Sequence, residues 1–192
     1  TSIVAKVKGI KIFARIFVTK KYVQDSGHEY TRGEWVKLLL DKVGCKYEEQ
    51  FDSKNYYYAD TRENENGIAA EIAKTMGIIP DETDEQDVPY FYPDEYATRE
   101  FAAYTAVMLM GYETTDEEPT CADAAQIRYK NVVAIALKKN MLSLNGDTFE
   151  PEKAINGNDA AQILKAIDQI TEDSVIDENY DSKVTYATNV VE

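Results

Sequence analysis

The feature that most constrains the fold is a pattern that occurs three times along this chain of 192 residues. In each copy a tyrosine or isoleucine is followed by a capping position, an acid three positions further on and an apolar helical stripe. The leading residues are Tyr30, Tyr96 and Ile155, which are 66 and 59 positions apart. Such copies pack together, because one helix pair cannot bury its apolar stripe alone. The pattern predicts helices near 31–43, 97–110 and 157–169.

Each of these helices has a candidate N-cap. Thr31 with Glu34 forms a capping box, in which each side chain satisfies a backbone N–H that the helix leaves unpaired. Asn156 begins a weaker version of the same box. In the second copy Ala97 stands at the cap position, and Thr98 can replace it if the helix starts one residue later.

A second type of helix precedes the capped one in two copies. Residues 68–79 and 132–141 are small and apolar on one face, and they end at Gly77 and Asn140, two residue types that tolerate positive φ. Turn motifs flank these helices in both copies: Tyr58-Ala59-Asp60 and Cys121-Ala122-Asp123 before them, and Phe91 and Phe149 with a following proline after them. Each copy therefore reads as helix, variable loop and capped helix, and the predicted fold is mostly α, with minor β-strands at the termini or in loops.

The same pattern divides the chain into segments. Residues 3–10 end in Gly-Ile like the helix before Ile78, which indicates the end of a helix from a truncated first copy, whereas residues 11–21 alternate like a strand. The predicted organisation is a leading copy that is truncated or altered, two complete copies and an acidic tail, over residues 1–55, 56–112, 119–170 and 171–192.

The net charge of −14 is unevenly distributed. Residues 1–21 contain six bases and no acid, whereas residues 22–192 carry a net charge of −20. The acidic surface repels phosphates and argues against a nucleic-acid partner. No apolar stretch reaches the roughly 20 residues of a transmembrane helix. The basic segment could contact an anionic wall polymer or a membrane surface, or its lysines could simply face water.

The repeated motifs resemble the S-layer homology (SLH) domain family, most clearly in Thr31-Arg32-Gly33-Glu34-Trp35 and the apolar residues that follow. The resemblance implies a pseudo-threefold bundle of three repeats around central helices. It also implies grooves between repeats that hold a cell-wall polysaccharide, often carrying a pyruvate ketal. A protein of this kind is extracellular and anchored to the cell wall or S-layer of a bacterium.

The resemblance also places the family's ligand-binding arginine. The motif position falls on Arg32 in the first copy and on Gly157 in the third. In the second copy a gapless match places Thr98 at this position, so that Arg99 lies one residue after it. A guanidinium group can bind a carboxylate in a bidentate manner, as a pyruvyl group requires. Arg32 could instead be a solvated first-turn residue or form an ion pair. The candidate polysaccharide-binding residues are Arg32, Arg99, Tyr57 and Tyr92, the tyrosines as platforms for sugar rings; Tyr58, Phe91 and Trp35 are predicted core residues.

Catalytic and metal sites have little support in the sequence. His28 is the only histidine, and it lies too close in sequence to Asp25 and Ser26 for the three side chains to form a triad. Cys45 and Cys121 lack the spacing of metal ligands, and they could form one disulfide or remain two thiols.

Two functions follow from these observations. The first is a non-enzymatic module, without cofactor or metal, that anchors a secreted protein to an anionic cell-wall polysaccharide through the grooves between repeats. The alternative is a divergent SLH-like structural or protein-interaction module that has lost glycan binding. Thr98 and Gly157 at the motif position favour the alternative.

Overall fold

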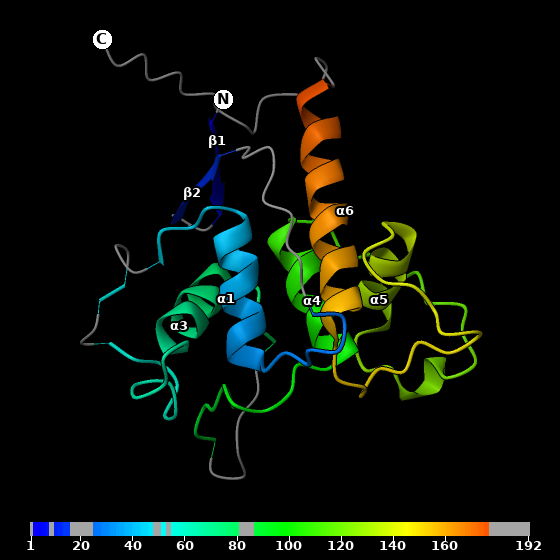
Figure 1. Ribbon diagram of the computed structural model, residues 1–192, viewed down its shortest axis with the longest axis horizontal. Helices are drawn as coiled ribbons and strands as arrows, with labels where there is room; N and C mark the ends of the chain where they lie inside the picture. The colour runs from blue at the N-terminus through cyan, green and yellow to red at the C-terminus, as the bar shows by residue number, and fades with distance from the viewer. Residues whose placement is uncertain are drawn as a thin grey trace.

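The computed structural model describes residues 2–7, 10–15, 25–47, 51–52, 55–80 and 87–176, with backbone only for 2–15 and 170–176. The fold is mostly helical, as predicted (Figure 1). In chain order the elements are β1 (Ser2–Val7), β2 (Ile10–Arg15), α1 (Arg32–Lys42), α3 (Gly67–Met76), α4 (Arg99–Leu109), the 3-10 turn η1 (Ala124–Gln126), α5 (Lys130–Lys138) and α6 (Gly157–Ile176).

The helices predicted from the repeated pattern are present. The three capped helices are α1, α4 and α6, and the two preceding helices are α3 and α5. Gly77 ends α3, and Asn140 lies in the turn after α5. Both residues have positive φ, as their residue types predict. Helix α6 continues to Ile176 and so extends into the segment predicted as an acidic tail; residues 177–192 lie outside the described part of the chain.

The prediction of a helix end at residues 3–10 is wrong. β1 pairs with β2 in an antiparallel hairpin, in which Val7 is opposite Ile10 and Ser2 is opposite Arg15. The β-branched residues of this segment favour a strand over a helix, and the two residues between the strands in the sequence include Gly9, which suits a tight connection. The alternation predicted from residue 11 onward is confirmed as far as Arg15.

A closed ring of three backbone hydrogen bonds joins the segments that lead into α1, α4 and α6. Tyr30 N–H donates to the carbonyl of Ile155 (3.2 Å), Ile155 N–H to that of Ala97 (2.9 Å), and Ala97 N–H to that of Tyr30 (2.9 Å). The ring brings the N-termini of these three helices to one end of the molecule (Figure 1).

The helices pack in pairs around a common core, and each pair combines helices from two neighbouring copies of the pattern. α3 packs against α1, and α5 packs against α4. Trp35 of α1, which is fully buried as predicted, donates its indole N–H to Thr105 Oγ1 of α4 at 2.8 Å. A buried indole needs such a partner, so this bond fixes how the two helices are oriented.

The N-caps define which residues of the three copies correspond. Thr31 forms the predicted capping box with Glu34. The side chain of Thr98, and not the methyl group of Ala97, caps α4, because its Oγ1 accepts from a backbone N–H of the first turn at 3.1 Å. Asn156 caps α6 in the same way.

Candidate binding surface

Four aromatic rings are linked by successive contacts from the loop before α3 to α4, and they are here called the aromatic row: Tyr57, Tyr58, Phe91 and Phe101. The centroids of successive rings are 5.0, 5.5 and 6.3 Å apart. Tyr58 and Phe91 are buried, which confirms the prediction that they are core residues. Tyr57 lies at the exposed end of the row, with 49% of its surface accessible.

Two carboxylates hold the row in place. Asp60 accepts hydrogen bonds from the N–H groups of Phe91 (3.0 Å) and Tyr92 (2.7 Å). Glu71 of α3 accepts from the N–H groups of Tyr57 (2.9 Å) and Tyr58 (3.0 Å), so both segments of the row are tied to the body of the protein. Charge-assisted hydrogen bonds of this kind are stronger than neutral ones, and they make the backbone of the row rigid.

Asp60 has a counterpart in the third copy, whereas Glu71 does not. Asp123 accepts from the N–H groups of Phe149 (2.8 Å) and Glu150 (2.7 Å), which repeats the Asp60 arrangement. The aspartates of the two predicted turns, Tyr58-Ala59-Asp60 and Cys121-Ala122-Asp123, therefore anchor the phenylalanine loops that follow. The position that corresponds to Glu71 in α5 is Ala134, so the repeat analysis offered no signal for Glu71.

Arg32 lies at the inner end of the row. Its guanidinium carbon is 5.2 Å from the ring centroid of Phe91 and 4.2 Å from that of Phe101. Only 9% of the residue is exposed, so Arg32 is not the solvated first-turn residue that the sequence allowed. Tyr92 follows Phe91 directly, and its ring stacks on Tyr90 with centroids 5.5 Å apart. Arg32 and Tyr57 therefore lie at opposite ends of the row, and Tyr92 lies next to it through its backbone.

Arg99 lies in the other half of the molecule and acts as an internal clamp. Its Nε donates to the carbonyl of Phe149 at 2.8 Å, one terminal nitrogen donates to the carbonyl of Ser143 at 2.6 Å, and the other pairs with Asp159 Oδ1 of α6. Only 5% of Arg99 is exposed. All three guanidinium nitrogens are therefore used inside the fold.

The ring of hydrogen bonds corrects the predicted register of the second copy. The residue equivalent to Tyr30 and Ile155 is Ala97, which is fully buried, whereas Tyr96 is 59% exposed. Arg99 is consequently not shifted by one residue: it follows the N-cap Thr98 directly, as Arg32 follows Thr31. Two of the three copies therefore keep the arginine in its motif position.

The third copy has glycine at this position for a steric reason. A Cβ atom on Gly157 would lie 2.1 Å from the carbonyl oxygen of Asp25, which no side chain can tolerate without a backbone shift. The backbone of the segment before α1 therefore leaves no room for a side chain at this position.

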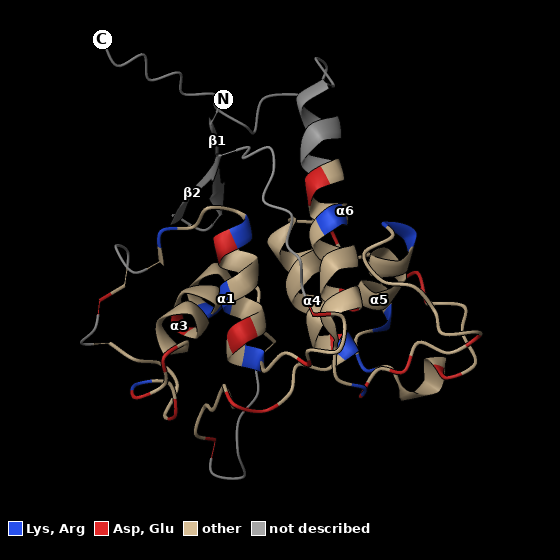
Figure 2. Ribbon diagram, in the orientation of Figure 1, with Lys and Arg blue, Asp and Glu red and all other residues tan. Residues whose placement is uncertain are grey.

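The exposed apolar side chains gather near the aromatic row. In the part of the chain that the structure describes, the large apolar side chains that are exposed are Tyr57, Val88 and Tyr96. Loops 57–65 and 87–96 lie side by side, because Ala59 N–H donates to the carbonyl of Pro89 at 3.0 Å and the Asn64 side chain donates to Asp94 at 2.9 Å. The same two loops also carry five exposed acids: Glu63, Glu65, Asp87, Asp94 and Glu95. Figure 2 shows where acidic and basic residues lie along the ribbon. We call these three apolar residues and five acids the acidic–aromatic surface.

Bases also contact the exposed Tyr57 and the half-buried Tyr56. The ammonium of Lys74 is 4.6 Å from the ring centroid of Tyr57, and the guanidinium of Arg62 is 4.7 Å from that of Tyr56. The first contact joins Tyr57 to the last turn of α3, and the second joins Tyr56 to the loop that precedes α3.

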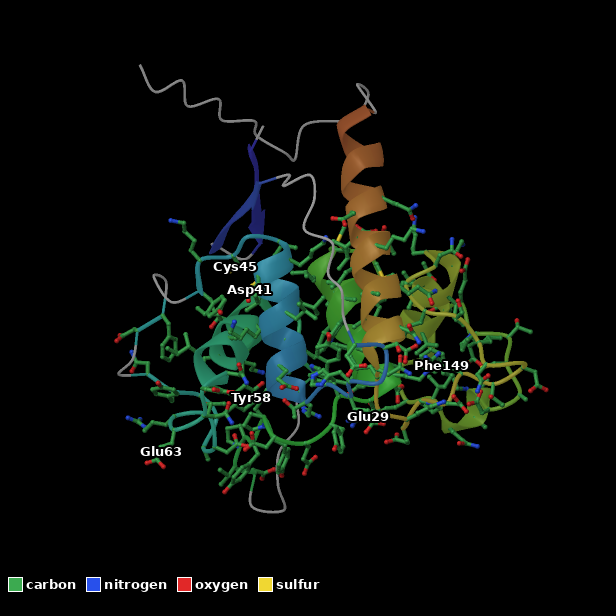
Figure 3. The ribbon with its side chains drawn as sticks, in the orientation of Figure 1. Glu29, Asp41, Cys45, Tyr58, Glu63 and Phe149 are labelled. Carbon is green, nitrogen blue, oxygen red and sulfur yellow. The ribbon has the colours of Figure 1, made fainter. Side chains whose placement is uncertain are left out.

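The histidine and the two cysteines considered in the sequence analysis lie in settings that show no catalytic or metal-binding arrangement among the described residues. His28 packs edge-on against Tyr30, with 4.5 Å between centroids, and lies 3.5 Å from Glu34 Oε2. Cys45 and Cys121 are both free thiols, and burial raises the pKa of Cys45 to about 11 (Cys45 is labelled in Figure 3). Within the described ranges no three His, Cys, Asp or Glu side chains come together as a metal site, and no helix is both long and apolar enough to span a membrane.

Comparison with known proteins gives no assignment. No protein-family model matches the chain, and no curated protein has a significantly similar sequence.

Proposed function

We propose that this chain is a non-catalytic module with an SLH-like three-repeat architecture, and that it binds another protein at a bacterial cell surface. The burial of both motif arginines carries the proposal. Arg32 and Arg99 are 9% and 5% exposed, and the third motif position is Gly157. A guanidinium group that is packed inside the fold is not presented to the carboxylate of a glycan, so the family's usual anchoring chemistry is weakened at all three junctions.

The hydrogen-bonded ring supports the architecture in this proposal. Tyr30, Ala97 and Ile155 exchange backbone hydrogen bonds in a cycle, and each is followed by a polar N-cap. Three equivalent segments that close on each other are what a pseudo-threefold repeat bundle requires.

The exposed surface supports a protein as the ligand. Tyrosine is enriched at protein–protein interfaces, because it combines a large apolar ring with a hydroxyl group and has few rotatable bonds. Tyr57 lies on one of two loops that hydrogen bonds hold together, and Val88 and Tyr96 lie on the other. Such a preformed surface loses little entropy on binding.

Glycan anchoring is the second candidate, and one observation favours it. Tyr57 is 49% exposed with Lys74 above its ring, so an anionic sugar could stack on the tyrosine and interact with the ammonium group. The surrounding charge of −14 opposes this binding, because only local cations attract an anionic polymer.

Co-sedimentation with purified cell walls separates the two candidates. The chain is mixed with walls that retain or lack their secondary polymer, and the bound fraction is measured. The proposal predicts the same background binding to both preparations. Polymer-dependent binding that Tyr57→Ala abolishes would overturn it in favour of anchoring. Tyr96→Ala is the matched control, because Tyr96 is also an exposed tyrosine but is not part of the aromatic row.

A further inference from the structure

We infer that the partner of the acidic–aromatic surface is the β1–β2 hairpin of a second copy of this chain. The inference rests on the proposed role as a protein-binding module, and it names the partner. The surface offers exposed apolar side chains at Tyr57, Val88 and Tyr96 among five exposed acids. Its best partner therefore combines positive charge with apolar residues on one face.

The hairpin carries that combination. Its register pairs Lys6 with Lys11 and Ser2 with Arg15, and side chains alternate along a strand. The same register places Phe13 opposite Val4, so apolar and basic residue pairs alternate along the hairpin. No acid occurs in the first 21 residues, which carry six bases, whereas the rest of the chain carries a net charge of −20. Within this chain, the hairpin is thus the segment whose charge complements the surface.

The fold separates the hairpin from the surface of its own copy. Figure 1 shows β1 and β2 at the end of the molecule where α1 finishes, and the loop that leads into α4 at the end where α1 begins. Helix α1 has 11 residues and is therefore about 16 Å long. Contact between a hairpin and a surface on different copies joins two unlike patches, either reciprocally in a two-fold dimer or successively in a head-to-tail chain.

The hairpin also gains from a partner. β1 and β2 form a two-stranded sheet, and neither pairs with another strand of the described chain. An isolated two-stranded hairpin is only marginally stable in water, and its outer edges have backbone groups without partners in the sheet. Packing on a preformed aromatic surface supplies the apolar cover that a third strand or a helix would otherwise provide.

The test is the association state of the full chain, measured by analytical ultracentrifugation over a range of concentrations and salt. We expect association that rises with protein concentration and weakens as salt increases, because the contact is between opposite charges. The variant Lys6→Glu/Lys11→Glu should weaken association by at least about tenfold. Lys139→Glu/Lys165→Glu changes the net charge equally at two exposed sites outside the hairpin, and should leave association within about twofold of the unmodified chain.

A charge swap gives the decisive result. Glu63 and Glu95 are exposed acids of the surface, and Figure 3 shows the Glu63 side chain directed away from the body of the protein. Glu63→Lys/Glu95→Lys alone should fail to associate, but a mixture with Lys6→Glu/Lys11→Glu should form a complex of the two variants. A chain that stays monomeric at every concentration, or association that neither double variant affects, would overturn the inference. Polymer-dependent binding to cell walls would instead overturn the proposed function, so the two failures are distinguishable.

Discussion

Replacing Arg99 with methionine tests whether this motif arginine has a structural role. The substitution keeps most of the apolar stem and removes three hydrogen bonds, to Phe149, Ser143 and Asp159. The Asp159 side chain is only 13% exposed, so its carboxylate would stay buried without its cation. Removing one partner of a buried ion pair typically costs about 3–5 kcal/mol. For a chain of this size, that loss corresponds to a decrease in Tm of about 6–20 °C.

Urea unfolding followed by circular dichroism measures this loss. Asp159→Asn and the double variant complete a thermodynamic cycle, in which a coupling energy of at least about 1 kcal/mol is expected for side chains in direct contact. Arg32→Met is the matched comparison, because Arg32 has the same place in its motif but packs on the rings of Phe91 and Phe101. A loss below about 1 kcal/mol for Arg99→Met would refute the clamp and make a ligand-binding role for Arg99 tenable again.

Three further substitutions test the caps, the close contacts and the buried charge. Thr98→Ala should lower the free energy of unfolding by about 1 kcal/mol through loss of the α4 N-cap, whereas the exposed Tyr96→Ala should change it by less than about 0.5 kcal/mol in the same urea titration. Gly157→Ala should lower the free energy of unfolding by about 1–3 kcal/mol, because the added Cβ would overlap a backbone carbonyl. Gly27→Ala should lower it clearly less, because its Cβ would meet nothing closer than 3.6 Å. Equal losses for the two variants would contradict the steric argument. Burial raises the pKa of the Glu100 carboxyl group. The protonated form is therefore favoured more in the folded state than in the unfolded chain, and its contribution to stability is lost as the pH rises through the folded-state pKa. The stability of Glu100→Gln relative to the unmodified chain should therefore increase as the pH rises above the ordinary pKa of a glutamate, and a difference that does not change with pH would contradict this reasoning.

Local patterns predicted the helices, because caps and apolar spacing act over one or two turns. Thr31, Glu34 and Gly77 each do what their residue type predicts in their local setting. The register of the second copy could not be predicted in this way. Tyr96 resembles Tyr30 in sequence, but the position that must be buried is Ala97, and burial depends on the ring of contacts with segments about 60 residues away.

The anchors of the candidate site show the same division between local and long-range effects. Asp60 was recognisable because Asp123 repeats it in a second turn. Glu71 lies in the middle of α3, where its carboxylate accepts from the backbone of Tyr57 and Tyr58 across a turn. Nothing in the helical pattern distinguishes such an acid from one that faces water.

The position of the motif arginines also bears on what the motif indicates. A cation in the first turn of a helix faces the positive end of the helix dipole, which disfavours it by roughly 0.3–1 kcal/mol. Arg32 and Arg99 stand in that turn of α1 and α4, so favourable contacts must offset this cost. For Arg99 the contacts are with Phe149, Ser143 and Asp159, all of which belong to the next copy. Joining neighbouring copies is therefore enough to explain the Thr-Arg pair at the start of a capped helix, and the pair indicates the repeat architecture without requiring an anionic ligand.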